Sequence, residues 1–319
     1  MNNISLICSD SVEWMKKQPS EIVNLIVADP PYNLGKKYGN DSDQKEISEY
    51  DAFMDAWVSE AIRLLKPGGT MYVFMGFRHI AKLYGKLEDR GLNFINWICW
   101  HYTQGIGKTK GFSPRHDDIL VFSKGDKFTF NLDDVRIPQK YYRKVNNMRG
   151  ANPGDVWEFS HIHYCQENRQ DHPTQKPEGL IERIVRASSN EGDIVLDPFL
   201  GSGTTARVCQ QLGRDCLGIE INPQYIKMAQ DRLDQEFSGF DSIDPRMKRV
   251  PLDLRDEKIR EEYIENHIVW FLDKHENDIQ GFLKEVENVY GNGNVGRKKK
   301  KMRAEHRDAP MLFESVQAG

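Results

Sequence analysis

The sequence contains no long apolar segment, and its cysteines show no pairing pattern. No stretch approaches the roughly 18–20 uninterrupted apolar residues that a membrane-spanning helix requires. The N-terminal residues lack the basic start and the apolar run of a secretory signal peptide. The five cysteines are odd in number and form no CxxC pair, which argues against a disulfide-stapled secreted domain. We therefore expect a reduced, cytoplasmic protein without a membrane segment.

A common metal-ligand pattern and a complete dinucleotide fingerprint are also missing. The spacing of His161, His163 and Cys165 matches no common structural zinc site, so we expect no bound metal. The glycine-rich segment 201–206 has Ala206 where the GxGxxG fingerprint has its third glycine. This absence disfavours a nicotinamide-dependent oxidoreductase, which would also need a hydride-transfer site that the sequence does not show.

The formal net charge is −4, but basic residues are concentrated late in the sequence. Against a single acidic residue, Glu305, residues 296–307 contain Arg297, Lys298, Lys299, Lys300, Lys301, Arg303 and Arg307. Such a cluster has two interpretations of similar weight: contact with nucleic-acid phosphates, or a solvated tail without a partner.

Apolar segments of strand length alternate with amphipathic segments of helix length over most of the chain. The predicted strands are residues 4–8, 22–28, 70–75, 95–100, 118–122, 194–196 and 216–219. The predicted helices are residues 50–65, 80–90, 177–188, 205–212 and 223–233. This alternation predicts an α/β fold, a doubly wound and mostly parallel sheet with helices on both faces. We expect the aromatic side chains of Phe74, Trp97 and Trp100 to lie in its core.

A glycine-containing segment, residues 197–205, follows a predicted buried strand. Gly201 and Gly203 allow the backbone to approach a ligand closely, and the following helix offers free N–H groups. Glu220, at the end of the next predicted strand, can accept both hydroxyls of a ribose. Taken alone, the glycines are equally consistent with a tight turn. The carboxylate of Asp197 would repel phosphate but suits the cationic sulfonium and ammonium groups of S-adenosylmethionine, which is the cofactor we expect.

The tetrapeptide Asp29-Pro30-Pro31-Tyr32 follows the predicted strand 22–28. Its prolines remove two N–H donors, so the segment presents acceptors: the Asp29 carboxylate and the Pro30 carbonyl. Two acceptors can hold both hydrogens of an exocyclic amino group and free the nitrogen lone pair to attack a methyl group. Tyr32 offers a flat face for stacking a base, which must be flipped out of a duplex to enter such a pocket. The alternative is a rigid turn with a capping aspartate.

Together, the DPPY tetrapeptide and the DPFLGSGTT segment at 197–205 resemble the amino-methyltransferase family of bacterial DNA modification enzymes. The catalytic motif precedes the variable region and the cofactor segment. This order resembles the β class, a circularly permuted form of the S-adenosylmethionine-dependent methyltransferase fold. The resemblance covers roughly residues 1–237. It implies a seven-stranded sheet with one antiparallel strand, in which residues 4–8 form the strand after Glu220.

The resemblance also implies roles for individual residues. Segments 172–177 and 115–120 match further family motifs. Lys176 and the hydroxyls of Ser202 and Thr204 would hold the methionine carboxylate, and Asp10 would reach the adenine amino group of the cofactor. The implied catalytic residues are Asp29, Pro30, Pro31 and Tyr32. The implied cofactor-binding residues are Asp10, Asp29, His172, Thr174, Lys176, Asp197, Pro198, Phe199, Gly201, Ser202, Gly203, Thr204, Glu220 and Asn222.

The expected reaction is methylation of N6 of a flipped-out adenine in double-stranded DNA. Asp29 favours adenine, because relatives that methylate cytosine N4 more often begin the tetrapeptide with serine; cytosine N4 is the main alternative. Methylation of RNA or of a protein glutamine amide is a second alternative. DNA binding without catalysis is a third, disfavoured because the tetrapeptide is complete.

The resemblance implies a catalytic domain at residues 1–237 and a charged helical extension with a basic tail at 238–319. Residues 126–171 would be the target-recognition region, inserted in the catalytic domain. Short recognition regions in the β class often accompany homodimers, so we expect a homodimer. The sequence leaves open whether a cognate restriction endonuclease accompanies the protein.

Overall fold

The computed structural model describes residues 2–35, 37–38, 41–42, 44–102, 107–137, 150–162, 170, 172–237 and 239–240. The chain divides into a unit of residues 1–138 and 151–250 and a second unit of residues 139–150 and 251–319. Apart from Gly150, the described residues belong to the first unit. The basic run at 296–307 and nearly all of the predicted extension lie outside the described residues, so the domain boundary at residue 237 stays a prediction.

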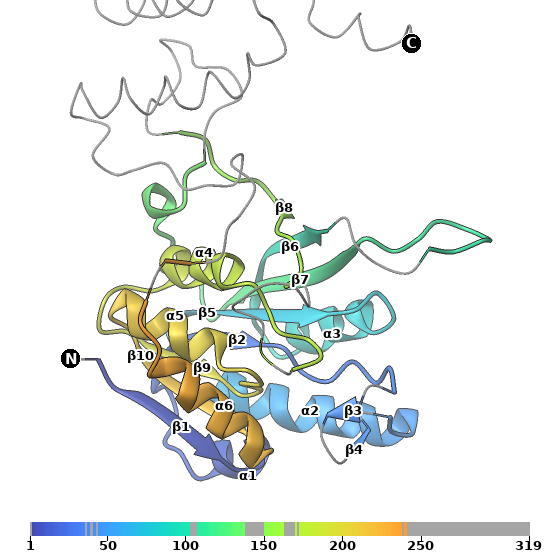
Figure 1. Cartoon of the computed structure of the whole chain (residues 1–319), viewed down its shortest axis with the longest axis horizontal. Coiled ribbons are helices and arrows are strands. Elements are labelled where there is room, and N and C mark those ends of the chain that lie inside the picture. Colours follow the sequence, from blue (N-terminus) through green and yellow to red (C-terminus); the bar gives the residue numbers. More distant parts are fainter. Residues whose placement is uncertain are drawn as a thin grey trace, which may run out of the picture. The chain divides into compact units, whose positions relative to one another are not determined.

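A mixed sheet with the strand order β1-β10-β9-β2-β5-β7-β6-β8 forms the centre of the fold (Figure 1). Its strands are β1 (Ile4–Cys8), β10 (Asp215–Glu220), β9 (Ile194–Asp197), β2 (Val23–Ala28), β5 (Leu65–Met75), β7 (His116–Ser123), β6 (Asn93–His101) and β8 (Val156–Glu158). β7 is antiparallel to both of its neighbours, and every other pairing is parallel. The predicted seven strands with one antiparallel member are therefore present, with an additional edge strand, β8.

The first strand of the chain completes the sheet beside a strand more than 200 residues later. β1 pairs in parallel with β10, with Ile4 opposite Cys216 and Cys8 opposite Glu220. This confirms the permuted order, because the segment that follows β10 in space begins the chain.

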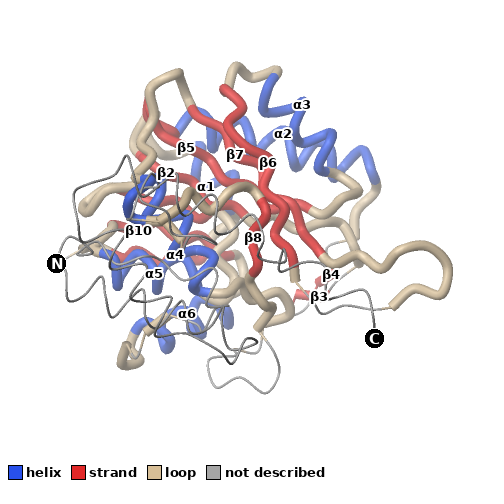
Figure 2. The backbone as a smooth tube through the Cα atoms, turned by 90° about the horizontal axis from the view of Figure 1, so that it is seen from above, coloured by secondary structure: helices blue, strands red, loops and turns tan. Residues whose placement is uncertain are grey.

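Helices cover both faces of the sheet (Figure 2). One face packs against α1 (Ser11–Lys16), α2 (Ile47–Leu64) and α3 (Ile80–Glu88), and the other against α4 (Glu178–Ser188), α5 (Thr204–Leu212) and α6 (Pro223–Leu233). In β2, Ile26 and Ala28 belong to the first core, and Leu25 and Val27 belong to the second. A strand buried on both faces has a continuous apolar sequence, which is why its position was predictable.

The elements missed by the sequence analysis are short. They are α1, β8, the 3-10 helix Leu132–Asp134 and the two-residue strands β3 (Lys37–Tyr38) and β4 (Asp41–Ser42). None is long enough to establish a clear hydrophobic period. Among the described residues, no helix combines the length and the apolar composition needed to cross a membrane.

The core prediction is confirmed for two of its three aromatic side chains. Phe74 and Trp100 are fully buried and meet edge to face, with ring centroids 6.1 Å apart. The prediction was wrong for Trp97, which is 39% exposed and donates its indole N–H to Asp118 at 2.8 Å. Trp97 lies on β6, close to the edge of the sheet, where its ring stacks on Tyr84 of α3.

Candidate active site

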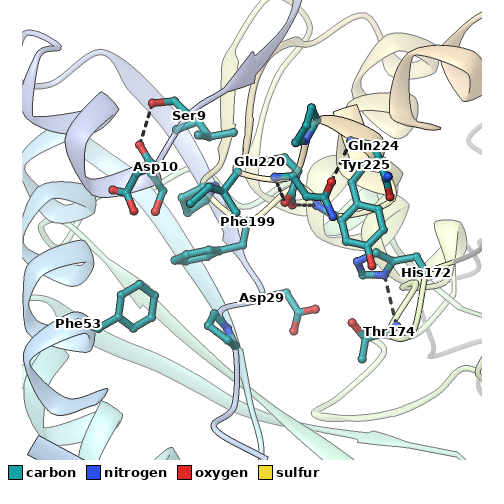
Figure 3. Close-up of a pocket in the computed structure, with 18 of the residues that line it drawn as sticks. Ser9, Asp10, Asp29, Phe53, His172, Thr174, Phe199, Glu220, Gln224 and Tyr225 are labelled. Atoms are coloured by element: carbon teal, nitrogen blue, oxygen red, sulfur yellow. Dashed lines mark hydrogen bonds between the residues drawn. The ribbon is translucent and has the colours of Figure 1, made fainter. Parts of the chain in front are cut away.

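A cavity of about 530 Å³ opens at the carboxyl ends of the parallel strands. Much of its lining comes from residues that end or follow β1, β2, β9 and β10, including Asp10, Asp29, Phe199 and Glu220. Figure 3 shows these side chains around one hollow, with the two predicted motifs on neighbouring strands. In open α/β sheets this edge is where ligands bind, so the topology itself brings the catalytic and cofactor motifs together.

Both carboxylate oxygens of Asp29 have partners. The Tyr32 hydroxyl donates to Oδ1 at 2.9 Å, and the Lys176 ammonium forms an ion pair with Oδ2. The Tyr50 hydroxyl donates to the Pro31 carbonyl at 2.9 Å and fixes the turn from the α2 side. The Asp29 carboxylate thus lies at the cavity, and a target amino group has to exchange with one of these two partners.

The Lys176 ammonium is surrounded by aromatic rings. It lies 5.8 Å from the ring centroid of Tyr32, 5.3 Å from that of Phe74 and 5.9 Å from that of Trp100. Its side chain is only 11% exposed. Three aromatic rings and one carboxylate therefore hold the Lys176 ammonium in place.

The Asp197 carboxylate is buried at the end of β9. Its Oδ1 accepts the backbone N–H of Phe199 at 3.0 Å, and the Thr205 hydroxyl bonds the same carboxylate. Burial, assisted by the negative charges of Asp29 and Glu220, raises the pKa of Asp197 to about 7, while the hydrogen bonds oppose the shift. A cation entering this region would favour the ionised form.

Glu220 connects the cofactor segment to the start of α6. Its Oε2 accepts the Gly201 N–H at 2.9 Å and its Oε1 accepts the Asn222 N–H at 2.8 Å. Burial raises the pKa of Glu220, against the lowering effect of these backbone donors. The Ile221 N–H is a further backbone donor to the carboxylate. A ribose hydroxyl would therefore share the carboxylate with these backbone groups.

The glycines of the cofactor segment also have a packing reason that the sequence analysis did not foresee. Gly201 (φ +52°) lies where a Cβ would come within 2.9 Å of the His172 imidazole. Gly203 (φ +81°) lies where a Cβ would come within 2.6 Å of the Ala229 Cβ on α6. Close packing within the protein, together with left-handed backbone, therefore requires glycine at both positions.

A buried ionic cluster between α4 and α6 contacts the cofactor segment, and the sequence analysis missed it. Arg232 donates to the Ser202 carbonyl at 3.2 Å, to the Thr204 hydroxyl at 2.9 Å and to Glu178 at 2.5 Å. The Thr204 hydroxyl in turn donates to the Lys176 carbonyl at 3.2 Å. The available signal was a charged residue, Arg232, on the apolar face of α6.

Two aromatic side chains, Phe53 and Phe199, line the cavity together with Glu220. Phe199 meets Phe53 at a centroid distance of 5.9 Å and Trp57 at 5.4 Å, both edge to face. Phe53 comes from α2 and carries no motif, so the sequence analysis missed it; Figure 3 shows its ring beside the hollow. These rings offer apolar faces of the size that a purine needs.

The predicted site residues converge, although they fall into three groups. Those that line the main cavity are Asp10, Asp29, Pro31, His172, Thr174, Pro198, Phe199, Gly201, Glu220 and Asn222. Those that line only an adjoining cavity of about 30 Å³ are Lys176, Asp197, Ser202 and Thr204. Pro30, Tyr32 and Gly203 line neither of the two. Asp10 and Asn222 also cap α1 and α6, accepting the N–H groups of Glu13 and Gln224 at 2.9 Å.

In the described part of the chain, no group of three His, Cys, Asp or Glu residues is placed to hold a metal ion. Of the HxHxC residues, His163 and Cys165 lie outside the described residues. His161 packs instead against Tyr102, with ring centroids 3.9 Å apart.

The carboxylates around the two cavities match the charge of the expected cofactor. Asp10, Asp29 and Glu220 border the main cavity, and Asp197 borders the smaller one. A volume of about 530 Å³ is within the usual range for small-molecule sites. The donor set therefore fits a cationic nucleoside such as S-adenosylmethionine.

Comparison with known proteins agrees with this chemistry. The type II methyltransferase M.HpaI of Haemophilus parainfluenzae is 60% identical over 287 residues, covering 89% of this chain and 91% of the relative. The DNA adenine methyltransferase YhdJ of Escherichia coli K12 is 40% identical over 249 residues, covering 72% and 82%. A putative DNA modification methylase from Thermus thermophilus, solved with S-adenosyl-L-methionine, has a TM-score of 0.52 at 26% identity, covering 73% of this chain and 95% of the other. A family model described as DNA methylase, N6_N4_Mtase, matches residues 23–231, and the chain belongs to this family of S-adenosylmethionine-dependent DNA methyltransferases.

Proposed function

We propose that the protein transfers the methyl group of S-adenosylmethionine to N6 of adenine in double-stranded DNA. The observation that carries the proposal is the position of Asp29, which lines the same cavity as Glu220. The group that orients the target amine thereby borders the site of the methyl donor. Relatives named as a type II methyltransferase and as an adenine methyltransferase support the assignment.

In this proposal the catalytic segment acts through hydrogen bonding. The Asp29 carboxylate and the Pro30 carbonyl accept the two hydrogens of the target amino group and turn its lone pair towards the cofactor. When bound, S-adenosylmethionine supplies an electrophilic methyl group on sulfur. Tyr32 donates to Asp29 through its hydroxyl, and its ring supplies a flat face on which the flipped base stacks.

The cofactor is assigned to the predicted residues by their location. Glu220 accepts the ribose hydroxyls, Asp10 receives the adenine amino group, and Phe53 and Phe199 border the purine. The methionine end lies towards His172, Thr174 and the adjoining small cavity. Lys176 is the cation available there for the methionine carboxylate. Ser202 and Thr204 reach it less readily, since both are buried and the Thr204 hydroxyl already bonds protein groups.

The test of the reaction is product analysis. Purified protein is incubated with unmethylated plasmid DNA and cofactor, and the DNA is digested to nucleosides that are resolved by mass spectrometry. N6-methyladenine as the product supports the proposal. A dominant N4-methylcytosine peak would select the cytosine alternative, and methylation of an RNA substrate in place of DNA would reject the DNA assignment.

The remaining assignments concern assembly and context. We infer that residues 126–171 recognise a specific DNA sequence and that the protein forms a homodimer in the cytoplasm. Sequencing of modified DNA identifies the target sequence, and sedimentation equilibrium gives the mass in solution. A monomer mass at all concentrations would reject the dimer.

A further inference from the structure

An arm between β6 and β7 carries a fully exposed phenylalanine. The arm is defined by Gly107–Lys108–Thr109–Lys110–Gly111–Phe112–Ser113–Pro114–Arg115. Phe112 is 99% exposed, more than any other large hydrophobic side chain in the described part of the chain. A Cβ built on Gly107 or Gly111 would meet nothing within 4 Å, so the arm stands clear of the protein. Figures 1 and 2 both show it projecting beyond the sheet.

The arm has a defined base and tip. The Tyr102 N–H donates to the Arg115 carbonyl at 2.9 Å, which holds the Arg115 end of the arm beside the residue that follows β6. Nearer the tip, the Lys108 N–H donates to the Ser113 hydroxyl oxygen at 2.8 Å, and Gly111 adopts φ +80°. Phe112 therefore lies within a turn that this hydrogen bond closes.

The arm leaves the sheet at the catalytic edge. β6 and β5 are both antiparallel to β7, so β6 runs in the same direction as β5 and β2. The end of β6 at His101 consequently lies at the same edge as Asp29, which follows β2. A DNA duplex that delivers a base to Asp29 must approach this edge, on which the arm stands.

The charge of the arm suits a nucleic-acid backbone. Lys108, Lys110 and Arg115 give it a charge of +3 without any acidic residue, although the whole chain has a net charge of −4. Lys108 and Lys110 are exposed. A second exposed phenylalanine, Phe77, follows β5 at the same edge, with the guanidinium of Arg78 6.0 Å from its ring centroid. Basic side chains with an apolar tip between them are the composition of DNA-bending and base-unstacking elements.

We propose that Phe112 is a wedge that enters the base stack and stabilises the flipped-out state of the target adenine, while Lys108 and Lys110 contact the flanking phosphates. A flipped base leaves unstacked neighbours, and an aromatic ring recovers part of the stacking that they lose. The proposal rests on the proposed DNA methylation. It assigns base extrusion to a side chain outside the predicted catalytic, cofactor-binding and recognition residues.

The test compares variants on a duplex with a normally paired target adenine and on one with an abasic site opposite it. Phe112→Ala should lower the single-turnover methylation rate about ten- to hundredfold on the paired duplex, since unstacking costs a few kcal/mol. The abasic duplex, whose adenine flips readily, should restore most of the rate. Phe112→Trp should retain flipping, measured as the fluorescence of 2-aminopurine at the target position. Phe94→Ala is the matched control, because Phe94 is 45% exposed at the opposite end of β6.

A Lys108→Ala, Lys110→Ala double variant separates phosphate contact from wedging. Its DNA affinity should fall with a salt slope smaller by about 1–2, at about 0.9 for each phosphate contact, and the abasic duplex should not rescue it. Equal rates for wild type and Phe112→Ala, or an equal loss on both duplexes, would overturn the wedge. Absence of methylation by the wild-type protein on any DNA would instead reject the proposed function itself.

Discussion

Lys176 and Asp29 lie 147 residues apart in the sequence, and their side chains form an ion pair at the carboxyl edge of the sheet. The pair joins the segment before α4 to the segment after β2. Each partner is assigned to a different ligand, Lys176 to the methionine carboxylate and Asp29 to the target amine. A cofactor carboxylate that attracts Lys176 would therefore free a carboxylate oxygen of Asp29 for the base.

Replacement of Lys176 by methionine should weaken cofactor binding. Methionine keeps an apolar stem among Tyr32, Phe74 and Trp100 but removes the charge. Loss of a hydrogen bond to a charged group costs about 1.5–3 kcal/mol, or roughly ten- to 150-fold in the dissociation constant. Titration calorimetry measures it, with Lys176→Arg as the charge-retaining control. An unchanged dissociation constant with a lower turnover number would assign Lys176 to the positioning of Asp29 alone.

Replacement of Asp29 by alanine should separate catalysis from cofactor binding. We expect the methylation rate to fall by roughly 10²-fold or more, because the amine loses an orienting acceptor. Cofactor affinity should stay within a few-fold of wild type. The two quantities are measured by single-turnover methylation and by calorimetry on the same preparation. Retained turnover together with lost cofactor binding would remove Asp29 from the catalytic role.

Asp197 should make cofactor affinity depend on pH. Burial raises its pKa to about 7, so it is largely protonated below that pH, and a cationic cofactor favours the ionised form. Affinity should therefore rise with pH, by up to about tenfold per unit below pH 7, and level off above it. Calorimetry between pH 5.5 and about 8.5 tests this. Asp197→Asn should bind more weakly with a flatter profile, and a wild-type affinity that falls with pH would contradict the assignment.

Ionisation of Asp197 should lower the stability of the cofactor-free protein as the pH rises, whereas it should raise cofactor affinity. Its pKa in the folded protein lies above the ordinary carboxyl value of 3.8, so the unfolded chain releases this proton first. The contribution of Asp197 to the free energy of unfolding is therefore lost as pH rises from about 4 to 7. Thermal melting of the cofactor-free protein should show that Asp197→Asn loses less stability than wild type across this window. Parallel curves for the two proteins would show that the carboxyl is already ionised.

The Glu178–Arg232 pair should be essential for holding the cofactor segment. The side chains are 7% and 2% exposed, and removing one partner of a buried pair costs about 3–5 kcal/mol. We expect Arg232→Met to lower the midpoint of urea unfolding strongly. The Glu178→Gln, Arg232→Met double variant should lose less than the sum of the single losses. Strict additivity would indicate that Glu178 and Arg232 stabilise the fold independently.

Site residues that lie at the ends of strands could be predicted from the sequence. Site residues that are positioned by the packing of helices could not. Asp29, Asp197 and Glu220 each follow or end a buried apolar strand, and parallel strands bring such residues to one edge. The requirement for glycine at position 203 comes from Ala229 on α6, which no local pattern reveals. Phe53 and Arg232 were missed for the same reason. Their contacts depend on how α2 and α6 pack against the sheet, beyond the reach of local periodicity.

The pairing of β1 with β10 also has a consequence for how the chain is made. β1 leaves the ribosome before the other strands of the sheet, and its hydrogen-bonding partners at Cys216–Glu220 are synthesised more than 200 residues later. At roughly 5–20 residues per second, the strand waits on the order of ten to forty seconds as an unpaired edge. The neighbouring strands β2, β5, β7 and β6 can pair during this time. The pairing of β10 with β1 is thus a late event in the folding of the newly made chain.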